Sequence, residues 1–389
     1  MRFVLAFLPW LAACAPEEGP AKPDPTTTDP TPTEPAATCG DPGILCTVAG
    51  TGGWGFLGDG PALDSPMYLP SSVLIGPGGR IELADWNNHR IRALEDDLLD
   101  TLAGNGYHAV AIAGPALASP MENPIDTARC DDEGFYVAEL HAHRIDYVDS
   151  NGILSYVAGL GGTPGYSGDG GPALQATLFE PSGVACGPDG SIYISDGVNH
   201  VVRVVTPDGL IDTLAGTGTV YGYADGPGDE ALFFRPERLV VHDGAVYVAD
   251  KFNSAIRRID LADRTVTTVA GTGEPGFSGD GGPAVDARLK YPVGVDFGPD
   301  GAMYVADTDN HVIRRVDVEG VITTIVGQPC GPDIDETTGV PVCYPGYSGD
   351  GGPALDAQLQ MPQDVVVDDS GTMWIADTIN SVIRSVQLP

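Results

Sequence analysis

The chain repeats one unit six times, and no other feature constrains its fold as much. Each unit carries an acidic residue directly after a short apolar run, at Asp85, Glu139, Asp196, Asp250, Asp307 and Asp377. Each unit also carries a glycine after a second apolar run, at Gly50, Gly104, Gly159, Gly216, Gly271 and Gly327. The acidic residues lie 54 or 57 residues apart, except where an insertion near 328–345 extends the last interval to 70. Six copies of both landmarks predict six units of one repeat architecture.

Each unit predicts four short β-strands. In the unit that spans 181–216, apolar runs alternate with Pro-Asp-Gly turns, and strands are expected near 183–186, 191–195, 201–206 and 211–215. The runs are apolar on both faces, which is typical of strands that are covered on both sides. Neighbouring blades of a β-propeller supply that cover. We therefore predict an all-β fold, a six-bladed β-propeller of four-stranded antiparallel blades.

The two ends of the repeat region complement each other. Residues 44–48 resemble the fourth strand of a unit that lacks its first three strands, whereas residues 364–388 supply three strands without a fourth. We expect the N-terminal strand, about 44–48, to join the C-terminal blade, about 364–388. This pairing closes the ring and removes two free sheet edges.

Two motif families resemble NHL repeats. One is Asp-x-x-Asn-His-x-Ile-Arg, as in Asp85–Arg92 and Asp307–Arg314. The other contains Ser-Gly-Asp-Gly-Gly-Pro-Ala, as in 166–173, 277–284 and 347–354. The resemblance covers about 44–389 and implies a propeller. It implies function only loosely, because relatives include protein-binding modules, kinase sensor domains, and lyases and lactonases with a metal in the channel.

The N-terminus resembles the leader of a bacterial lipoprotein. Residues 1–13 carry Arg2 and then an apolar run that is too short to span a bilayer, which is typical of a signal peptide. The sequence Leu-Ala-Ala-Cys that ends at Cys14 resembles a lipobox and implies lipid attachment there; the alternative is an ordinary secretory signal with a coincidental cysteine. Residues 14–38, rich in Pro and Thr, predict a disordered tether. The propeller would occupy 39–389, anchored in the bacterial envelope, at the outer membrane on its periplasmic or surface side.

The chain is strongly acidic, with a formal net charge of −35. Such a surface repels phosphate backbones, so we exclude nucleic acid as a main partner. Acidity is explained by solubility alone, or by a cationic partner. We expect a monomer that binds a protein or glycan ligand.

Seven cysteines leave an even six after Cys14 is assigned to the lipid. In an oxidising compartment such a count predicts disulfides. The candidate bridges are Cys39 with Cys46, Cys130 with Cys186, and Cys330 with Cys343. For Cys130 and Cys186, which lie in adjacent blades, two free buried thiols are the alternative.

One face of the propeller is expected to carry both motif families. Because consecutive strands reverse direction, the connections from a fourth strand to the next first strand share a face with the turns between second and third strands. The candidate binding residues on this face are Asp59, Asp169, Asp280, Asp350, Asn88, Asn199 and Asn310. The alternative is structural: carboxylates that cap backbone N–H groups, and repeated Asp–Arg pairs that fix the blade.

The second blade departs from the repeat. Its loop lacks the usual aspartate and carries His108, and its turn carries Glu139, His141 and His143, with Asp146 in place of the usual arginine. Three imidazoles and a carboxylate on one face are a candidate site for zinc or a similar divalent metal. Drift in a decaying repeat is the alternative.

No motif in the chain points to a particular catalytic mechanism or an organic cofactor. The first strands show no Glu, Asn or His set that would line the channel as in lactonase-type propellers. We therefore expect an envelope-anchored binding or scaffold module. The alternative is a metal-dependent lyase or lactone hydrolase with its site at the channel mouth.

Overall fold

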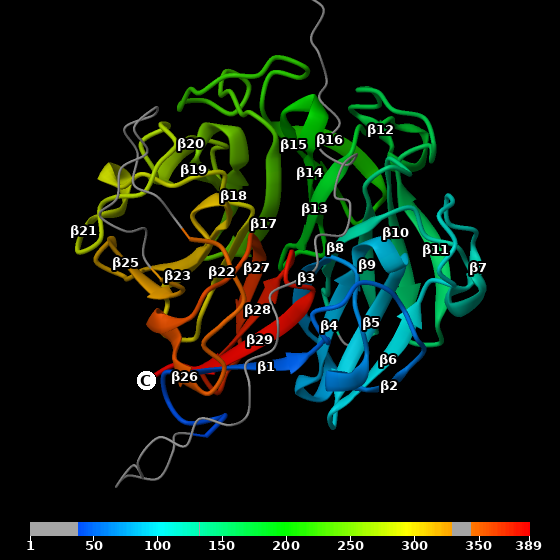
Figure 1. Cartoon of the computed structure of the whole chain (residues 1–389). Coiled ribbons are helices and arrows are strands. Elements are labelled where there is room, and N and C mark those ends of the chain that lie inside the picture. The colour runs from blue at the N-terminus through cyan, green and yellow to red at the C-terminus, as the bar shows by residue number, and fades with distance from the viewer. Residues whose placement is uncertain (1–37, 132, 329–343) are drawn as a thin grey trace, which may run out of the picture. The chain divides into compact units, whose positions relative to one another are not determined.

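The computed structural model describes residues 38–131, 133–328 and 344–389, which form six antiparallel sheets arranged as blades around a channel (Figure 1). This confirms the predicted six-bladed propeller. No helix among these residues is long and apolar enough to cross a membrane. The predicted signal peptide (1–13) with Cys14, all but the last residue of the predicted tether (14–38), and the cysteines Cys330 and Cys343 lie outside the described residues.

Each blade runs from an inner first strand at the channel to an outer fourth strand. Blade 1 contains β3 (Pro70–Ile75), β4 (Ile81–Asp85), β5 (Arg90–Glu95) and β6 (Leu98–Ala103). Blade 2 contains β8 (Pro124–Ala128), β9 (Gly134–Glu139), β10 (Arg144–Asp149) and β11 (Ile153–Ala158). Blade 3 contains β13 (Pro181–Cys186), β14 (Ile192–Asp196), β15 (Val201–Val205) and β16 (Leu210–Ala215).

The second half of the ring repeats this order. Blade 4 contains β17 (Pro236–His242), β18 (Ala245–Asp250), β19 (Ala255–Asp260) and β20 (Val266–Ala270). Blade 5 contains β22 (Gly294–Phe297), β23 (Met303–Asp307), β24 (Val312–Val316) and β25 (Val321–Val326). Blade 6 contains β27 (Pro362–Val367), β28 (Thr372–Asp377), β29 (Val382–Gln387) and, from the other end of the chain, β1 (Ile44–Ala49).

Five blades gain a short fifth strand that the sequence pattern did not predict. A Gly-Pro pair from the preceding loop folds back onto the outer strand in β2 (Gly60–Pro61), β7 (Gly114–Pro115), β12 (Gly171–Pro172), β21 (Gly282–Pro283) and β26 (Gly352–Pro353). A single 3-10 turn follows each pair, at Ala62–Asp64, Ala116–Ala118, Ala173–Gln175, Ala284–Asp286 and Ala354–Asp356. The strand pairing was not expected, because two residues are too few to show a strand period.

Further 3-10 turns shape the hairpins. In four blades such a turn joins the second strand to the third, at Trp86–Asn88, Gly197–Asn199, Lys251–Asn253 and Thr308–Asn310. In blade 1 another joins the first strand to the second, at Pro77–Gly79. In the first group the chain leaves through a left-handed residue, such as His200 with φ of 60°. We call the face formed by these second-to-third turns and the fourth-to-first loops the loop face.

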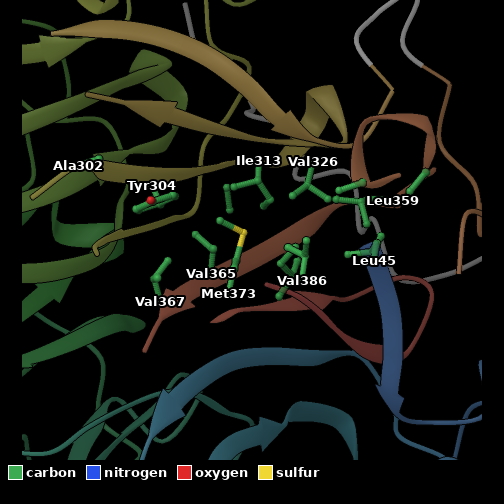
Figure 2. Close-up of a cluster of buried hydrophobic side chains, with 14 residues drawn as sticks. Leu45, Ala302, Tyr304, Ile313, Val326, Leu359, Val365, Val367, Met373 and Val386 are labelled. Carbon is green, nitrogen blue, oxygen red and sulfur yellow. The ribbon is translucent and has the colours of Figure 1, made fainter. Parts of the chain in front are cut away.

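The N-terminal strand closes the ring as predicted. In β1, Leu45 pairs with Val386 and Thr47 pairs with Arg384, both antiparallel. Figure 2 shows Leu45 beside Val386 in the cluster that packs blade 6 against blade 5, with Tyr304 and Met373 among its members. Leu45 is fully buried. The first strand is therefore a permanent part of the last blade rather than an exposed arm.

The channel is crossed by one arginine. Arg238 of β17 donates hydrogen bonds to the carbonyl oxygens of Ser71, Ile125 and Gln363, at 2.5, 2.8 and 3.0 Å. These residues open the inner strands of blades 1, 2 and 6, so one side chain ties four blades together. Because inner strands start at the loop face, Arg238 closes the channel near that face. A cavity of about 250 Å³ lies along the later residues of the same strands.

Two carboxylates flank this arginine. Asp126 and Asp364 lie 3.3 and 3.4 Å from Nε of Arg238. Burial raises the pKa of Asp364 to about 7, although the positive charge of Arg238 acts in the opposite direction. Charged side chains thus occupy a channel for which the sequence had indicated no Glu, Asn or His ligand set.

Two of the three predicted disulfides fall within the described residues, and both are confirmed. Cys39 is bonded to Cys46, and Cys130 is bonded to Cys186. The first bridge fastens the start of the fold. The second joins Cys130, just after the inner strand of blade 2, to Cys186, the last residue of the inner strand of blade 3. Cys186 lines the channel cavity. The alternative of free thiols in blades 2 and 3 is wrong.

The two bridges should differ in their contribution to stability. A disulfide limits the unfolded chain more when its loop is longer, and the sequence separations are 56 and 7. Loop-closure entropy gives about 4 kcal/mol for the longer loop and about 2.5 kcal/mol for the shorter one. Urea denaturation of Cys130→Ala/Cys186→Ala and of Cys39→Ala/Cys46→Ala, as two double variants, measures both. Equal losses would contradict this account.

Candidate functional site

A buried cluster of polar side chains, the Asp–Asn–Arg lock, fixes the loop face in five blades. In blade 3, Oδ1 of Asp196 accepts a hydrogen bond from Phe179 N at 2.7 Å. Its Oδ2 accepts from Asn199 Nδ2 at 2.8 Å and from Arg203 Nη1 at 3.4 Å. All three polar side chains are buried. Equivalent locks are Asp85–Asn88–Arg92, Asp250–Asn253–Arg257, Asp307–Asn310–Arg314 and Asp377–Asn380–Arg384.

The predicted binding aspartates belong to this lock. Asp169 forms an ion pair with Arg203 and accepts a hydrogen bond from Thr213 Oγ1 at 2.8 Å. Asp59, Asp280 and Asp350 pair in the same way with Arg92, Arg314 and Arg384, at 3.6, 2.6 and 2.9 Å. These contacts match the structural alternative.

The corresponding residue of blade 4 was not predicted from the sequence. Asp225 pairs with Arg257 at 2.7 Å and so completes the lock of that blade. Its loop lacks the Ser-Gly-Asp-Gly-Gly-Pro-Ala motif, so the residue could be found only by its position ahead of the inner strand.

The predicted asparagines also fasten loops. Asn88, Asn199 and Asn310 each donate a second hydrogen bond to a glycine carbonyl of the loop, at Gly55, Gly165 and Gly276, over 2.7 to 2.8 Å. The lock therefore joins the fourth-to-first loop to the second-to-third turn. Burial raises the pKa of Asp196 to about 6, against hydrogen bonds from Asn199 and Phe179 N that favour the carboxylate.

In blades 2, 3 and 5 the histidine that ends the second-to-third turn makes a hydrogen bond to the next blade. Nδ1 of His143, His200 and His311 accepts a hydrogen bond from a backbone N–H of the next blade, at Glu180, Arg235 and Met361, each at 3.1 Å. The acceptor must be a neutral imidazole. Burial, with Lys290 nearby, lowers the pKa of His311 to about 4. His143, predicted as a metal ligand, therefore has this inter-blade contact.

Blade 2 replaces the lock with an inverted ion pair. Arg144 occupies the position of Arg90 and pairs with Asp146 at 2.6 Å. Burial and the charge of Asp146 raise the pKa of Glu139 well above its usual range. Glu139 is fully buried. This second predicted metal ligand thus lies inside the blade, at the position that the lock aspartate takes elsewhere.

The remaining predicted ligands, His108 and His141, do come together. Their ring nitrogens and a carboxylate oxygen of Glu122 all lie within 4.8 Å of one another. Among the described residues this is the one place where three such side chains converge. Glu122 was not predicted, because it stands before the inner strand of blade 2 with no motif around it.

An aromatic cluster lies on the loop face at blades 3 to 5. Phe234 stacks on Tyr221 with ring centroids 4.5 Å apart, and contacts Phe252 at 5.0 Å. Tyr291 contacts Phe252 at 5.6 Å, and His200 packs edge-on against Phe234 at 5.6 Å. Tyr221 and Phe252 remain 60% and 40% exposed. The sequence did not reveal this cluster, since its rings come from loops of three blades.

Two segments of the chain match the model of a known protein family. The family model of the teneurin NHL domain matches residues 156–222 and 262–331. The chain is 31% identical over 253 residues to protein SUPPRESSOR OF QUENCHING 1 of Arabidopsis thaliana. The matched region covers 61% of this chain and 24% of that protein. It is 31% identical over 236 residues to teneurin-3 of Danio rerio, 57% of this chain and 8% of that one.

The chain is an NHL-repeat β-propeller. It spans a quarter or less of the length of these two curated relatives. Among solved structures, a protein of unknown function from Bacteroides thetaiotaomicron shares the fold with a TM-score of 0.64 at 16% identity, over 88% of this chain and 75% of that one. An auxiliary nutrient binding protein from Bacteroides ovatus gives 0.62 at 15% identity, over 88% and 76%.

The lock should dominate the stability of this NHL propeller. Arg203→Met leaves Asp169 and buried Asp196 without their cation, which typically costs about 3–5 kcal/mol of unfolding free energy. Asn199→Ala removes only hydrogen bonds and should cost about 1–3 kcal/mol. Urea denaturation measures both.

A matched control is Arg258→Met, since Arg258 pairs with Asp260 at 2.9 Å within β19, where both side chains are partly exposed to solvent. Such a pair contributes about 0–1 kcal/mol. Equal losses for Arg203→Met and Arg258→Met would show that the lock is not structural.

The turn histidines of the NHL propeller should make its stability depend on pH. The pKa of His311 is about 4 when folded and near 6.5 when unfolded. Between these values the unfolded chain binds more protons, so acidification from pH 6.5 to 4 destabilises the fold. His311→Ser copies Ser254 and Ser381, which replace it in blades 4 and 6. The wild type should lose more stability than this variant over that window, measured by urea denaturation at each pH; parallel curves would contradict it.

Proposed function

We propose that this NHL propeller is a binding module that holds a protein or glycan ligand on its loop face and is displayed at the bacterial cell envelope by a lipid on Cys14. The observation that carries the proposal is the aromatic cluster around Phe234. Exposed contiguous apolar patches on a soluble domain are commonly binding sites. Tyrosine is enriched at binding hot spots because it offers a rigid apolar body and a polar tip.

Polar groups surround this cluster. Arg235 pairs with Glu180 at 2.8 Å, and Lys251 pairs with Glu237 at 3.2 Å while its Nζ lies 5.8 Å from the Phe252 ring. An apolar centre with a charged rim is the usual anatomy of a recognition surface. Both a protein side chain and the apolar face of a sugar ring fit against such rings.

The closed channel supports binding on the face rather than within the ring. Arg238 crosses the channel next to the loop face, so a ligand there meets a floor of charged side chains and backbone. The Bacteroides ovatus nutrient binding protein shares only the fold, so the proposal rests on the loop face itself.

The second candidate function is a metal-dependent lyase or lactone hydrolase at the channel mouth. The convergence of His108, Glu122 and His141 favours it, since two imidazoles and a carboxylate are ligands of catalytic zinc. The channel adds no support: Asp126 and Asp364 are engaged with Arg238. Turnover of lactones by metal-loaded protein, lost in His141→Asn, would establish this activity.

Site-specific photocrosslinking in intact cells tests the binding proposal. A photoreactive side chain at position 252 or 221, on the loop face, should yield discrete adducts. The same group at Val318, which is 69% exposed in a turn on the opposite face, is the matched control and should yield none. The doubly substituted Tyr221→Ser/Phe252→Ser protein should bind the identified ligand at least about tenfold more weakly, the cost of about 1.4 kcal/mol.

Adducts of equal yield from both faces, or none from the loop face, would overturn the proposal.

The same cells test the lipid anchor at Cys14. The wild type should partition with the membrane fraction, and Cys14→Ser should leave it. Retention of Cys14→Ser in that fraction would contradict lipid attachment at this cysteine.

A further inference from the structure

We propose that blade 2 holds one divalent transition-metal ion on the loop face, bound by His108, His141, Glu122 and the side-chain oxygen of Asn123. The site differs from the one expected from sequence, which had included Glu139 and His143. It lies at blade 2, whereas the aromatic cluster belongs to blades 3 to 5, so the binding proposal and the metal site do not depend on each other. The second candidate function would use this metal site.

Four ligand atoms converge from three segments of the chain. Nε2 of His108 lies 3.0 Å from a carboxylate oxygen of Glu122 and 2.9 Å from Oδ1 of Asn123. Nδ1 of His141 lies 2.8 Å from the same Asn123 oxygen. Ligands of a tetrahedral ion at about 2.0–2.2 Å lie somewhat farther apart than this. Small rotations of the two exposed imidazoles supply the difference, and the other tautomer of each ring presents the same nitrogen as a lone pair.

The surrounding structure holds these groups in place. Nδ2 of Asn123 donates to Oδ1 of Asn87 in blade 1, at 3.2 Å, which turns its oxygen toward the histidines. His108 forms a β-bridge with Met121 and stacks on His89 with ring centroids 4.8 Å apart. Such outer contacts orient metal ligands and raise affinity.

The propeller does not need these side chains. At the positions of Glu122, Asn123 and His141, blade 1 carries Tyr68, Leu69 and Asn87, which do not form a metal-ligand set. Both blades use the backbone there in the same way: Tyr68 N and Glu122 N each donate to the acidic residue that ends the second strand. Blade 1 therefore shows which residues suffice for folding.

The ligand chemistry selects the ion. Imidazole nitrogens favour Zn²⁺, Cu²⁺ and Ni²⁺, whereas Ca²⁺ and Mg²⁺ prefer oxygen ligands. His108 is exposed, with 56% of its side chain accessible, so water or a group of another molecule can reach a metal held here. We therefore expect Zn²⁺ to bind and Ca²⁺ not to bind at this site.

Calorimetry of the chelator-treated full chain with Zn²⁺ alone tests the site, with Co²⁺ absorption as a readout of coordination geometry. The wild type should bind one ion with a tetrahedral Co²⁺ spectrum. His141→Asn and Asn123→Leu copy blade 1 and keep a fold that the protein already uses. His141→Asn should weaken binding about 100-fold, and Asn123→Leu by at least about 10-fold, the range for losing even an outer-shell partner.

His242→Asn is the control, because this histidine stacks on Phe297 on another blade. It should bind Zn²⁺ as the wild type does, and circular dichroism should show all three variants folded. The proposal would be overturned if the wild type did not bind Zn²⁺, or if His141→Asn bound Zn²⁺ as tightly as the wild type. The same holds if Ca²⁺ binds as tightly as Zn²⁺, since that would indicate the acidic surface alone.

Discussion

The loop face depends on a buried carboxylate that faces a buried guanidinium. Each Asp–Asn–Arg lock removes a negative and a positive group from water, which is costly unless both are paired and hydrogen-bonded. In blade 3 the pairing is nearly complete, because Asp196 accepts from a backbone N–H, an amide and Arg203, while Arg203 also reaches Asp169. Such a cluster is stable in one arrangement only, and it thereby fixes the loops that cover each blade.

Blade 2 shows what happens when the lock is exchanged. Arg144 and Asp146 keep one buried ion pair, so the charge of the arginine remains compensated. The acid that ends the second strand becomes Glu139, and its pKa is raised by burial and by the negative charge of Asp146. The loop is no longer held by a lock aspartate. His108 instead approaches the turn and meets His141, so the same departure from the repeat that changes the interior also creates the polar cluster outside.

The loop face is thus divided into sectors of different chemistry. Blade 4 presents Phe234 and Phe252 where blade 2 presents Glu122 and His141, although the backbone is the same at both places. The lock uses only backbone atoms at the first of these positions, so the side chain there is free to differ from blade to blade. Arg238 closes the channel beneath both sectors, which leaves the face itself as the surface for recognition.

The sequence by itself determined the number of blades and the closure of the ring by residues 44–48, because a repeat places equivalent residues in equivalent positions. It named Cys130 and Cys186 as a candidate bridge, and the structure decided between that bridge and free thiols. The sequence also indicated the lock through the recurrence of Asp196 and Arg203. The sequence named His108 and His141 as candidate ligands, but tertiary structure decided which side chains join them. Glu122 and Asn123 become ligand candidates only when their loop meets the turn at His141, and Arg238 is a channel floor only because inner strands from six blades face one axis. These contacts involve residues that depart from the repeat, so the pattern that the blades share does not predict them.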